Sequence, residues 1–182
     1  MALLSWAYYA EEMAVGREDY YATASERPGR FLGIAGEVVT TDGLERLFGQ
    51  GCDPRDGRAL GRAVSADDER AVAGFALTFC PPKTVSVLWV IGDEAASSAV
   101  LDADEAAVSA AMAFLEDHAA FNPARARGLL QVDTEGLPAA AFVHRTSRSA
   151  DPQLHTHVLV ANKVRTRDGQ WLSLDARVQS AQ

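Results

Sequence analysis

Apolar and polar residues alternate along LHTHVLVAN, residues 154–162, in a run rich in β-branched side chains. Because neighbouring side chains of a β-strand point to opposite faces, this pattern predicts a strand with His155 and His157 on the same face. The run AAAFVHR, residues 139–145, predicts a second strand that ends near His144. The segment between them, TSRSADPQ, carries the Ser, Asp and Pro of a turn, so we expect the two strands to form a hairpin.

Other stretches also have the composition of strands, being rich in β-branched and aromatic residues. They are GFALTFC (74–80), TVSVLWVI (84–91), LLQVDT (129–134) and the stretch around WLSL (171–174). Pro81 and Pro82 separate the first two of these strands. Asp168 and Gly169 predict a turn before the last one.

An Ala-rich, periodic stretch predicts a long helix over about 95–121. Its apolar side is expected to comprise Val100, Ala103, Ala107, Ala111, Phe114 and Leu115. Further helices are predicted at DGLERLF, with Asp42 as the N-cap, and over residues 1 to about 24. Several strands with one long helix between them predict an α+β fold, in which helices flank a largely antiparallel sheet in two or three layers.

The chain of 182 residues is most simply one domain, 1–182, long enough to bury a core. Its 48% hydrophobic and 23% charged residues are typical of a soluble globular protein. No run has the length of a membrane span and no secretory signal opens the chain. Cys52 and Cys80 fit neither a disulfide framework nor a paired-cysteine metal site, which favours a reducing cytoplasm.

The formal net charge of −8 argues against a general nucleic-acid binder, whose surface is usually basic. The charge is uneven, however. Between residues 144 and 167 lie five cationic residues against Asp151 alone: Arg145, Arg148, Lys163, Arg165 and Arg167. Binding of phosphate could therefore be local to the histidine hairpin.

Three of the four histidines, His144, His155 and His157, can converge on one point of the predicted hairpin. Neutral imidazoles on a rigid strand pair suit a divalent metal ion and leave open positions for water or substrate. The plainer alternative is that they are ordinary half-buried histidines. The spacing of three imidazoles favours the metal site.

Two tyrosine pairs, Tyr8-Tyr9 and Tyr20-Tyr21, lie near the N-terminus. The simpler interpretation is that one member of each pair packs inward and the other lies at the surface. The alternative is that one phenolic oxygen is a nucleophile.

With tyrosines and histidines both in view, the chain resembles the MobF-type conjugative relaxases of the HUH endonuclease superfamily. Three blocks carry the resemblance, in the family's order: YYAEEMAVGREDYYATASERPGRFLG, LTFCPPKTVSVLW and HRTSRSADPQLHTHVLVANKVRTRDGQWLSLD. AFLEDHAAF and CDPRDGRALGR are similar to actinobacterial members. The resemblance implies a cytoplasmic enzyme that nicks and rejoins one DNA strand at a plasmid's transfer origin. Its partners would be single-stranded or hairpin DNA and the accessory proteins of the transfer complex.

The resemblance also implies roles for individual residues. His144, His155 and His157 would hold Mg²⁺ or Mn²⁺, with Zn²⁺, Ni²⁺ and Co²⁺ as further candidates. Tyr8 would attack the phosphodiester to give a 5′-phosphotyrosyl link, and Tyr20 or Tyr21 would serve the second transfer.

Tyr9 completes the catalytic candidates. Lys83, Arg145 and Arg148 are candidates for contacts with the DNA backbone, and Asn162 is a candidate for supporting the metal ligands.

The chain departs from the family at Ala76, where members usually have an aspartate that orients a metal-binding histidine. Three explanations stay open: the protein is naturally impaired, another carboxylate substitutes, or the aspartate was removed deliberately. The family also has a strand before its tyrosines and a C-terminal segment that closes over DNA, so we expect this catalytic domain to be incomplete.

Two other functions stay open. The first is a relaxase-derived module that binds DNA without cutting it, which Ala76 and the acidic net charge favour. The second is a small-molecule metalloenzyme with a histidine triad, as in cupin-like barrels. That class predicts a fourth ligand, often Glu, shortly after the second histidine, and VLVANK offers none.

Overall fold

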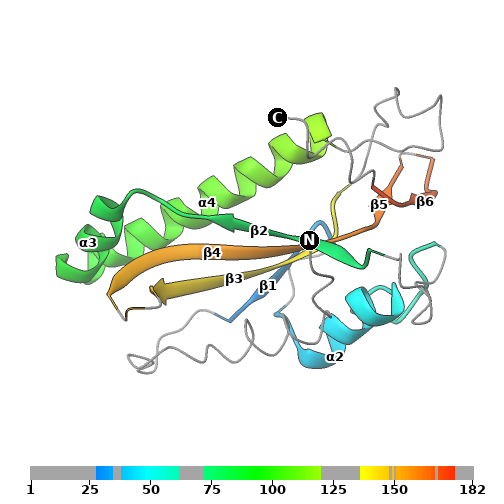
Figure 1. The fold of residues 1–182 in the computed structure, drawn as a ribbon, viewed down its shortest axis with the longest axis horizontal. Coiled ribbons are helices and arrows are strands. Elements are labelled where there is room, and N and C mark those ends of the chain that lie inside the picture. Colours follow the sequence, from blue (N-terminus) through cyan, green and yellow to red (C-terminus); the bar gives the residue numbers. More distant parts are fainter. Residues whose placement is uncertain are drawn as a thin grey trace.

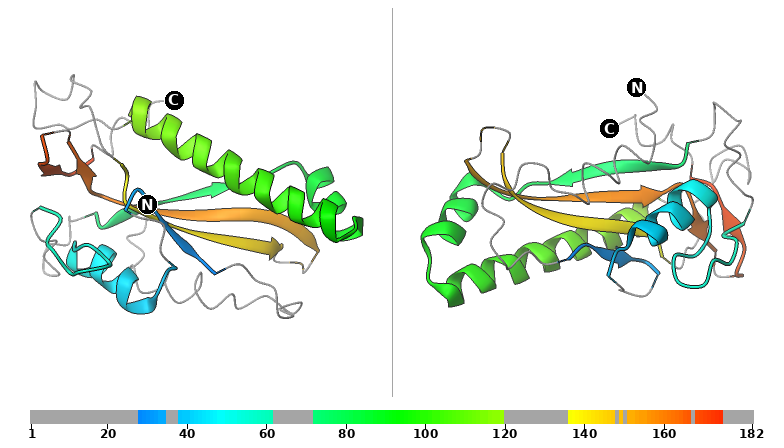
Figure 2. Two further views of the ribbon diagram at one scale, coloured as in Figure 1. Left: turned by 180° about the vertical axis from the view of Figure 1, so that it is seen from behind. Right: turned by 90° about the horizontal axis from the view of Figure 1, so that it is seen from below.

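The computed structural model of the chain describes residues 28–34, 38–61, 72–119, 136–147, 149, 151–166 and 168–174. Their main feature is a four-stranded antiparallel sheet (Figure 1). Its strands, in spatial order, are β1 (Arg30–Leu32), β3 (Ala139–Thr146), β4 (Pro152–Ala161) and β2 (Gly74–Phe79). A separate strand pair consists of β5 (Val164–Arg165) and β6 (Trp171–Leu172). Helices lie on both faces of the large sheet (Figure 2), which confirms the predicted α+β fold.

The predicted histidine hairpin is present as β3 and β4. His144 lies directly opposite His155 in the register of the two strands. The turn is closed by a 2.9 Å hydrogen bond that the backbone N–H of Ser147 donates to the carbonyl oxygen of Asp151. Because side chains alternate along a strand, His155 and His157 share one face, as the sequence pattern predicts.

The predicted strand at 74–80 is present as β2, which pairs with β4 and forms one edge of the sheet. Thr78 lies opposite His157, and Ala76 lies opposite Leu159. Both β2 side chains therefore belong to the face that carries the histidines.

The other face of the sheet is covered by α4 (Glu94–Ala119), which confirms the predicted long helix. The residues that this helix buries recur every fourth position: Val100, Asp104, Val108 and Met112. The predicted apolar side is correct at Val100 and Leu115 and wrong at Ala103, Ala107 and Phe114, which are exposed.

The error on α4 has a physical cause. The buried side of the helix includes a charged residue, Asp104, whose carboxylate accepts a 2.8 Å hydrogen bond from the hydroxyl of Thr156 on β4. A carboxylate paired in this way is compatible with burial, although its residue type predicts exposure. Alanines, with one methyl each, are tolerated on either side of a helix.

The histidine-bearing face is covered at one end by α2 (Thr41–Leu44) and the π-helical turn η1 (Glu45–Gln50) that continues it. A core cluster lies beneath them: Phe31, Ile34, Leu44, Leu47, Phe48, Leu60, Ala140, Phe142, Leu159 and Ala161. The predicted N-cap, Asp42, is wrong. The N-cap is Thr40, whose hydroxyl accepts a 3.0 Å hydrogen bond from the backbone N–H of Gly43, and Asp42 lies in the first turn. A carboxylate there is favoured by the positive end of the helix dipole.

The prediction of a strand over residues 84–91 is wrong. These residues belong to helix α3 (Lys83–Ile91). Pro82 precedes the first helical residue with an extended backbone, and its carbonyl oxygen accepts the N–H of Val85. The helix packs against β4 and α4 and buries Ser86 completely. Tertiary contacts of this kind outweigh the weak strand preference of β-branched residues.

The remaining predictions divide into two groups. The turn at Asp168-Gly169 and the strand around WLSL are present, the latter as β6. The predicted helix over residues 1–24 and the predicted strand over 129–134 lie outside the described residues. Within the described part of the chain, the helices are too short or too polar to cross a membrane.

Candidate metal centre

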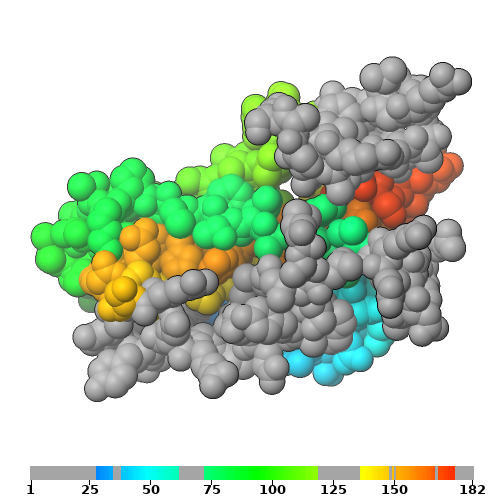
Figure 3. Space-filling model, in the orientation of Figure 1, coloured from blue at the N-terminus to red at the C-terminus, as the bar shows by residue number. Residues whose placement is uncertain are grey.

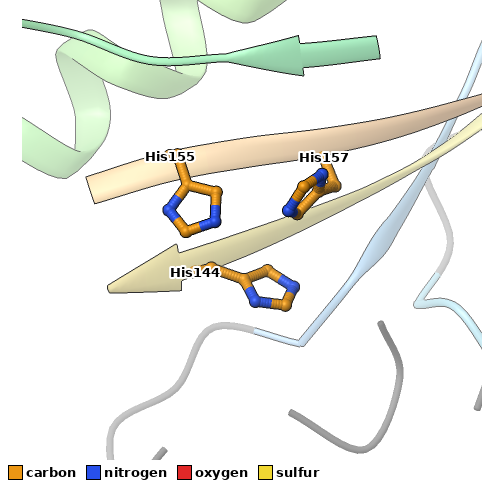
Figure 4. A group of neighbouring side chains, drawn as sticks. All are labelled: His144, His155 and His157. Carbon is orange, nitrogen blue, oxygen red and sulfur yellow. The ribbon is translucent and has the colours of Figure 1, made fainter. Parts of the chain in front are cut away.

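The three predicted ligands come together on the part of the histidine-bearing face that α2 and η1 do not cover. His144 extends from β3, and His155 and His157 extend from β4 (Figure 4). Their ring centroids are 4.9–5.3 Å apart, and their potential ligand nitrogens all lie within 4.8 Å of one another. Two nitrogens on one tetrahedral ion are about 3.4 Å apart at metal–nitrogen distances near 2.1 Å. Rotation about the side-chain bonds would bring the rings to that separation.

Hydrogen bonds orient two of the rings. The Nδ1 atom of His155 lies 2.9 Å from the carbonyl oxygen of Gln153. Because a carbonyl oxygen only accepts, Nδ1 carries the proton and the lone pair on Nε2 is available to a metal ion. The Nδ1 atom of His157 lies 3.1 Å from the hydroxyl oxygen of Thr78. Histidines that bind metals are commonly held through the second ring nitrogen in this way.

The surroundings of His157 favour a neutral imidazole. Burial, followed by the nearby His144 and His155, lowers the pKa of His157 from the usual 6.5 to about 4. His157 is therefore neutral at physiological pH, which is the protonation state that a metal ligand needs.

Helix α3 holds the hairpin that carries the ligands. The buried hydroxyl of Ser86 accepts a 2.9 Å hydrogen bond from the backbone N–H of Leu154, next to His155. The Nζ atom of Lys83 lies 2.5 Å from the carboxylate of Asp151 and 2.6 Å from the carbonyl oxygen of Pro152. These contacts join the segment after β2 to the start of β4, and Figure 3 shows the two surfaces side by side.

The lysine also affects the charge of its partner. Its hydrogen bond to Asp151, together with one from Ser147, holds the pKa of the Asp151 carboxyl below its usual range. Both members of the ion pair are about half exposed, so its contribution to stability is small. Its geometric effect is to fix the turn.

The residues predicted to contact DNA have other contacts in the described structure. Lys83 forms the pair with Asp151, and the guanidinium of Arg145 lies 5.4 Å from the ring centroid of Trp89. Lys163, one of the five cationic residues noted above, is only 6% exposed, and burial lowers its pKa. Arg148 lies outside the described residues. Contact between Lys83, Arg145 or Arg148 and DNA stays a prediction.

Asn162 supports the fold at a distance from the metal ligands. Its side-chain nitrogen donates to the carbonyl oxygen of Val72 at 2.9 Å, and its side-chain oxygen accepts the N–H of Leu174 at 2.8 Å. These contacts join the end of β4 to the segments before β2 and after β6. The role of Asn162 in the structure is therefore to hold these segments together.

Ala76 lies exposed on the histidine-bearing face, where its methyl group accepts no hydrogen bond. Within the described residues, the cluster of potential metal ligands consists of the three histidines and includes no carboxylate. The ring contacts of His155 and His157 are with a carbonyl oxygen and a hydroxyl, not with a carboxylate. The four tyrosines, Tyr8, Tyr9, Tyr20 and Tyr21, lie outside the described residues.

Sequence reasoning predicted the three histidines of the cluster but missed the residues that contact them or their strand. Thr78, Gln153 and Ser86 were not singled out. For Thr78 a signal was available, because it lies two positions after Ala76 and so on the same face of a strand. The roles of Gln153 and Ser86 depend on contacts with backbone atoms, which the spacing of residues in the sequence does not predict.

Comparison with known proteins decides the family. A family model described as TrwC relaxase matches residues 5–182. The chain belongs to the TrwC relaxase family. This finding confirms the predicted MobF-type relaxase resemblance. TrwC and related relaxases are enzymes that nick and join DNA.

Curated relatives of this TrwC-family chain include two multifunctional conjugation proteins TraI. One, from Escherichia coli, is 34% identical over 157 residues, which are 80% of this chain. The other, from Escherichia coli strain K12, is 34% identical over 166 residues, or 88% of this chain. In both cases the match spans 9% of the relative's own length.

Solved structures of the conjugative relaxase TrwC share the fold. A metal-bound structure in complex with oriT DNA aligns with a TM-score of 0.68 and 27% identity, covering 96% of this chain and 59% of that one. A copper-bound complex aligns with a TM-score of 0.65 and 30% identity, again covering 96% and 59%. A complex with a 27-mer DNA that comprises the recognition hairpin and the cleavage site aligns with a TM-score of 0.62 and 28% identity, covering 82% and 54%.

Proposed function

We propose that this chain is the metal-dependent part of a relaxase that nicks and rejoins one DNA strand at a specific site and thereby initiates conjugative transfer. The observation that supports this most directly is the histidine triad, placed on one face of the sheet within a TrwC relaxase domain. The metal-bound TrwC complexes with oriT DNA support both the metal and the DNA partner.

The chemistry follows from the charge of the phosphodiester. Its non-bridging oxygens repel a nucleophile, and a divalent ion bound to His144, His155 and His157 would act as a Lewis acid on them. Imidazole ligands carry no formal charge when neutral, so they would offset the positive charge of the ion less than carboxylates would. The rigid hairpin fixes the position of the ion relative to the sheet.

Tyr8 is the proposed nucleophile. Its phenolic oxygen loses a proton and forms a bond to phosphorus, the bond between phosphorus and the 3′ oxygen breaks, and that oxygen takes up a proton. The products are a 5′-phosphotyrosyl link and a free 3′-hydroxyl. One of Tyr20 and Tyr21 would carry out the second transfer, and Tyr9 stays a further candidate. The covalent link conserves the energy of the phosphodiester, so rejoining needs no ATP.

The three imidazoles also bear on the identity of the ion. Mg²⁺ prefers oxygen ligands, whereas imidazole suits first-row transition metals. A triad without a carboxylate therefore favours Mn²⁺, Co²⁺, Ni²⁺ or Zn²⁺ over Mg²⁺.

The DNA partner that we propose is single-stranded or hairpin DNA from a transfer origin, in the cytoplasm and together with accessory proteins. The cytoplasmic location is supported by the free thiols of Cys52 and Cys80. Lys83 and Arg145 lie on the elements that flank the triad and are candidates for contacts with the DNA backbone.

A second function, binding of DNA without cleavage, is favoured by one observation. Ala76 removes the carboxylate that family members usually place on this face, and the ring contacts of His155 and His157 are with a carbonyl oxygen and a hydroxyl instead. Under this alternative the triad would bind metal and the chain would bind DNA, but no covalent product would form.

An adduct assay separates the two functions. The protein would be mixed with single-stranded oriT DNA from its own element and Mn²⁺ and analysed on a denaturing gel, alongside Ala76→Asp and Tyr8→Phe. Nicking predicts an SDS-resistant protein–DNA band that increases with Ala76→Asp and disappears with Tyr8→Phe. DNA binding with no such band in any variant would contradict nicking and support the binding module.

A further inference from the structure

Thr78 lies on the histidine-bearing face and contacts one of the three histidines. Its hydroxyl oxygen lies 3.1 Å from Nδ1 of His157. The two residues are direct cross-strand partners of β2 and β4. Thr78 is itself exposed on the edge strand, where a hydroxyl could equally be satisfied by water.

We propose that Thr78 is the positioning residue of His157: its hydroxyl accepts the Nδ1 proton and thereby directs the Nε2 lone pair toward the metal ion. This inference rests on the proposed metal-dependent function and deepens it. Thr78 would act through His157 and would not touch the metal or the DNA phosphate.

The tautomer argument follows from the neighbouring ligand. His155 carries its proton on Nδ1, because its partner is the carbonyl oxygen of Gln153. If Thr78 accepts from Nδ1 of His157, the two β4 histidines have the same tautomer and both present Nε2 as a metal ligand. A hydroxyl that instead donated to Nδ1 would leave the proton on Nε2 and block coordination.

The register explains why Thr78 contacts the ring of His157 and Ala76 does not. Directly opposite residues of an antiparallel pair have Cβ atoms about 4.5–5.5 Å apart, whereas diagonal neighbours are about 7–8 Å apart. Thr78 is opposite His157, so a side chain as short as threonine spans the gap. Ala76 is opposite Leu159 and therefore diagonal to His157, a distance that its methyl group does not span.

Thr78 thus supplies a neutral acceptor in a chain that lacks the aspartate at position 76. A neutral hydroxyl orients an imidazole but raises its basicity less than a carboxylate does. We therefore expect orientation of His157 to persist in this chain while the enhancement of its basicity is lost.

The test replaces the hydroxyl and keeps the shape of the side chain. Thr78→Val removes the acceptor, Thr78→Ser retains it, and Thr41→Val is the matched control on exposed residue Thr41 at the start of α2. Affinity for Mn²⁺ and Co²⁺ would be measured by calorimetry on each purified chain, with the Co²⁺ absorption spectrum as a report on ligand geometry. Circular dichroism would establish that each variant is folded.

We expect Thr78→Val to weaken metal binding by about 10- to 100-fold, the effect usual for loss of such a partner. Thr78→Ser should stay within a few fold of the unsubstituted chain, and Thr41→Val should not differ from it. In metal-free protein at neutral pH, nitrogen NMR should find the His157 proton on Nδ1, and Thr78→Val should shift it toward Nε2. Unchanged affinity, spectrum and tautomer in Thr78→Val would overturn the proposal.

These readouts are independent of DNA cleavage. If Thr78→Val weakens metal binding but no variant forms a covalent adduct, the positioning role stands and the nicking function fails. If the adduct forms while Thr78→Val binds metal normally, the function stands and the positioning role fails.

Discussion

The histidine-bearing face of the sheet has two halves, formed by the same strands, that differ in burial and in the kind of side chain they carry. In one half, Ala140, Leu159 and Ala161 are buried beneath α2 and η1. In the other, His144, His155 and His157 are only half-buried and face one another (Figure 4). β3 and β4 contribute to both halves.

The difference shows how one hairpin serves stability and chemistry together. The covered half anchors the strands by burial of apolar surface, which is the main source of folding free energy. The open half then presents three imidazoles from a backbone that is already fixed. A metal ion would find its ligands largely in place, so little ordering cost would accompany binding.

The largest effect is expected from removing a ligand in the open half. His155→Ala should weaken metal binding by more than about 100-fold, because it deletes a direct ligand whose mere orientation is worth about 10- to 100-fold. The free energy of unfolding should change by less than about 1 kcal/mol, since the side chain is only half-buried. Calorimetric titration with Mn²⁺ and urea unfolding would measure the two quantities.

His118→Ala is the matched control for that substitution. His118 lies on α4, is exposed and stacks on Phe114 with ring centroids 4.0 Å apart. Metal binding by His118→Ala should be unchanged. Equal loss in both variants, or in neither, would contradict the triad.

The covered half should respond in the opposite way. Leu47 on η1 is 1% exposed, so Leu47→Ala removes fully buried apolar volume and should cost about 3 kcal/mol of the free energy of unfolding. Metal affinity of the folded fraction should stay within a few fold. A fall in affinity as large as that of His155→Ala would mean that the two halves are not separable.

The contact between α3 and the hairpin lies beside the histidines, at the start of β4. Ser86→Ala leaves the backbone N–H of Leu154 without its buried acceptor and should cost about 1–3 kcal/mol. Ser98→Ala, at an exposed position of α4, is the control and should have little effect. Thermal unfolding of the two variants would measure the difference, and similar melting temperatures would contradict an anchoring role for Ser86.

A further effect concerns pH in the metal-free protein. His157 has a pKa of about 4 in the folded chain and about 6.5 when unfolded, so the unfolded state binds the extra proton between these values. Stability should therefore fall as the pH is lowered from about 6.5 to about 4. Urea midpoints at pH 7, 5.5 and 4.5 would measure it. His157→Gln should flatten the dependence over this range, and an undiminished slope in that variant would assign it to other groups.

Much of this organisation could be predicted from the sequence, and the exceptions have physical reasons. The alternation around His155 predicts both the strand and the shared face, because strand periodicity depends on local geometry alone. The β-branched run at 84–91 is equally strand-like in composition but forms α3. Its helical conformation begins after Pro82 and is stabilised by the packing of Ser86 against β4. The composition of the run indicates neither of these effects.

The same distinction applies within the site. The clustering of His144, His155 and His157 could be predicted because histidines are rare in this chain and two of the three lie two residues apart on a strand. The position of Thr78 on the same strand face as Ala76 could be predicted, but its contact with His157 could not. That contact depends on the register between β2 and β4, which are separated by more than seventy residues. The predicted catalytic tyrosines lie outside the described residues and stay predictions.

The most direct test of the account is the location of a metal ion in a crystal of this chain grown with Mn²⁺. An anomalous difference map recorded near the manganese absorption edge would locate the ion without reference to any expected ligand. We predict one peak bound by Nε2 of His155, Nε2 of His157 and one ring nitrogen of His144, with Thr78 in contact with Nδ1 of His157. A peak elsewhere in the molecule, with the three imidazoles unligated, would contradict the central claim that this face of the sheet is a metal centre.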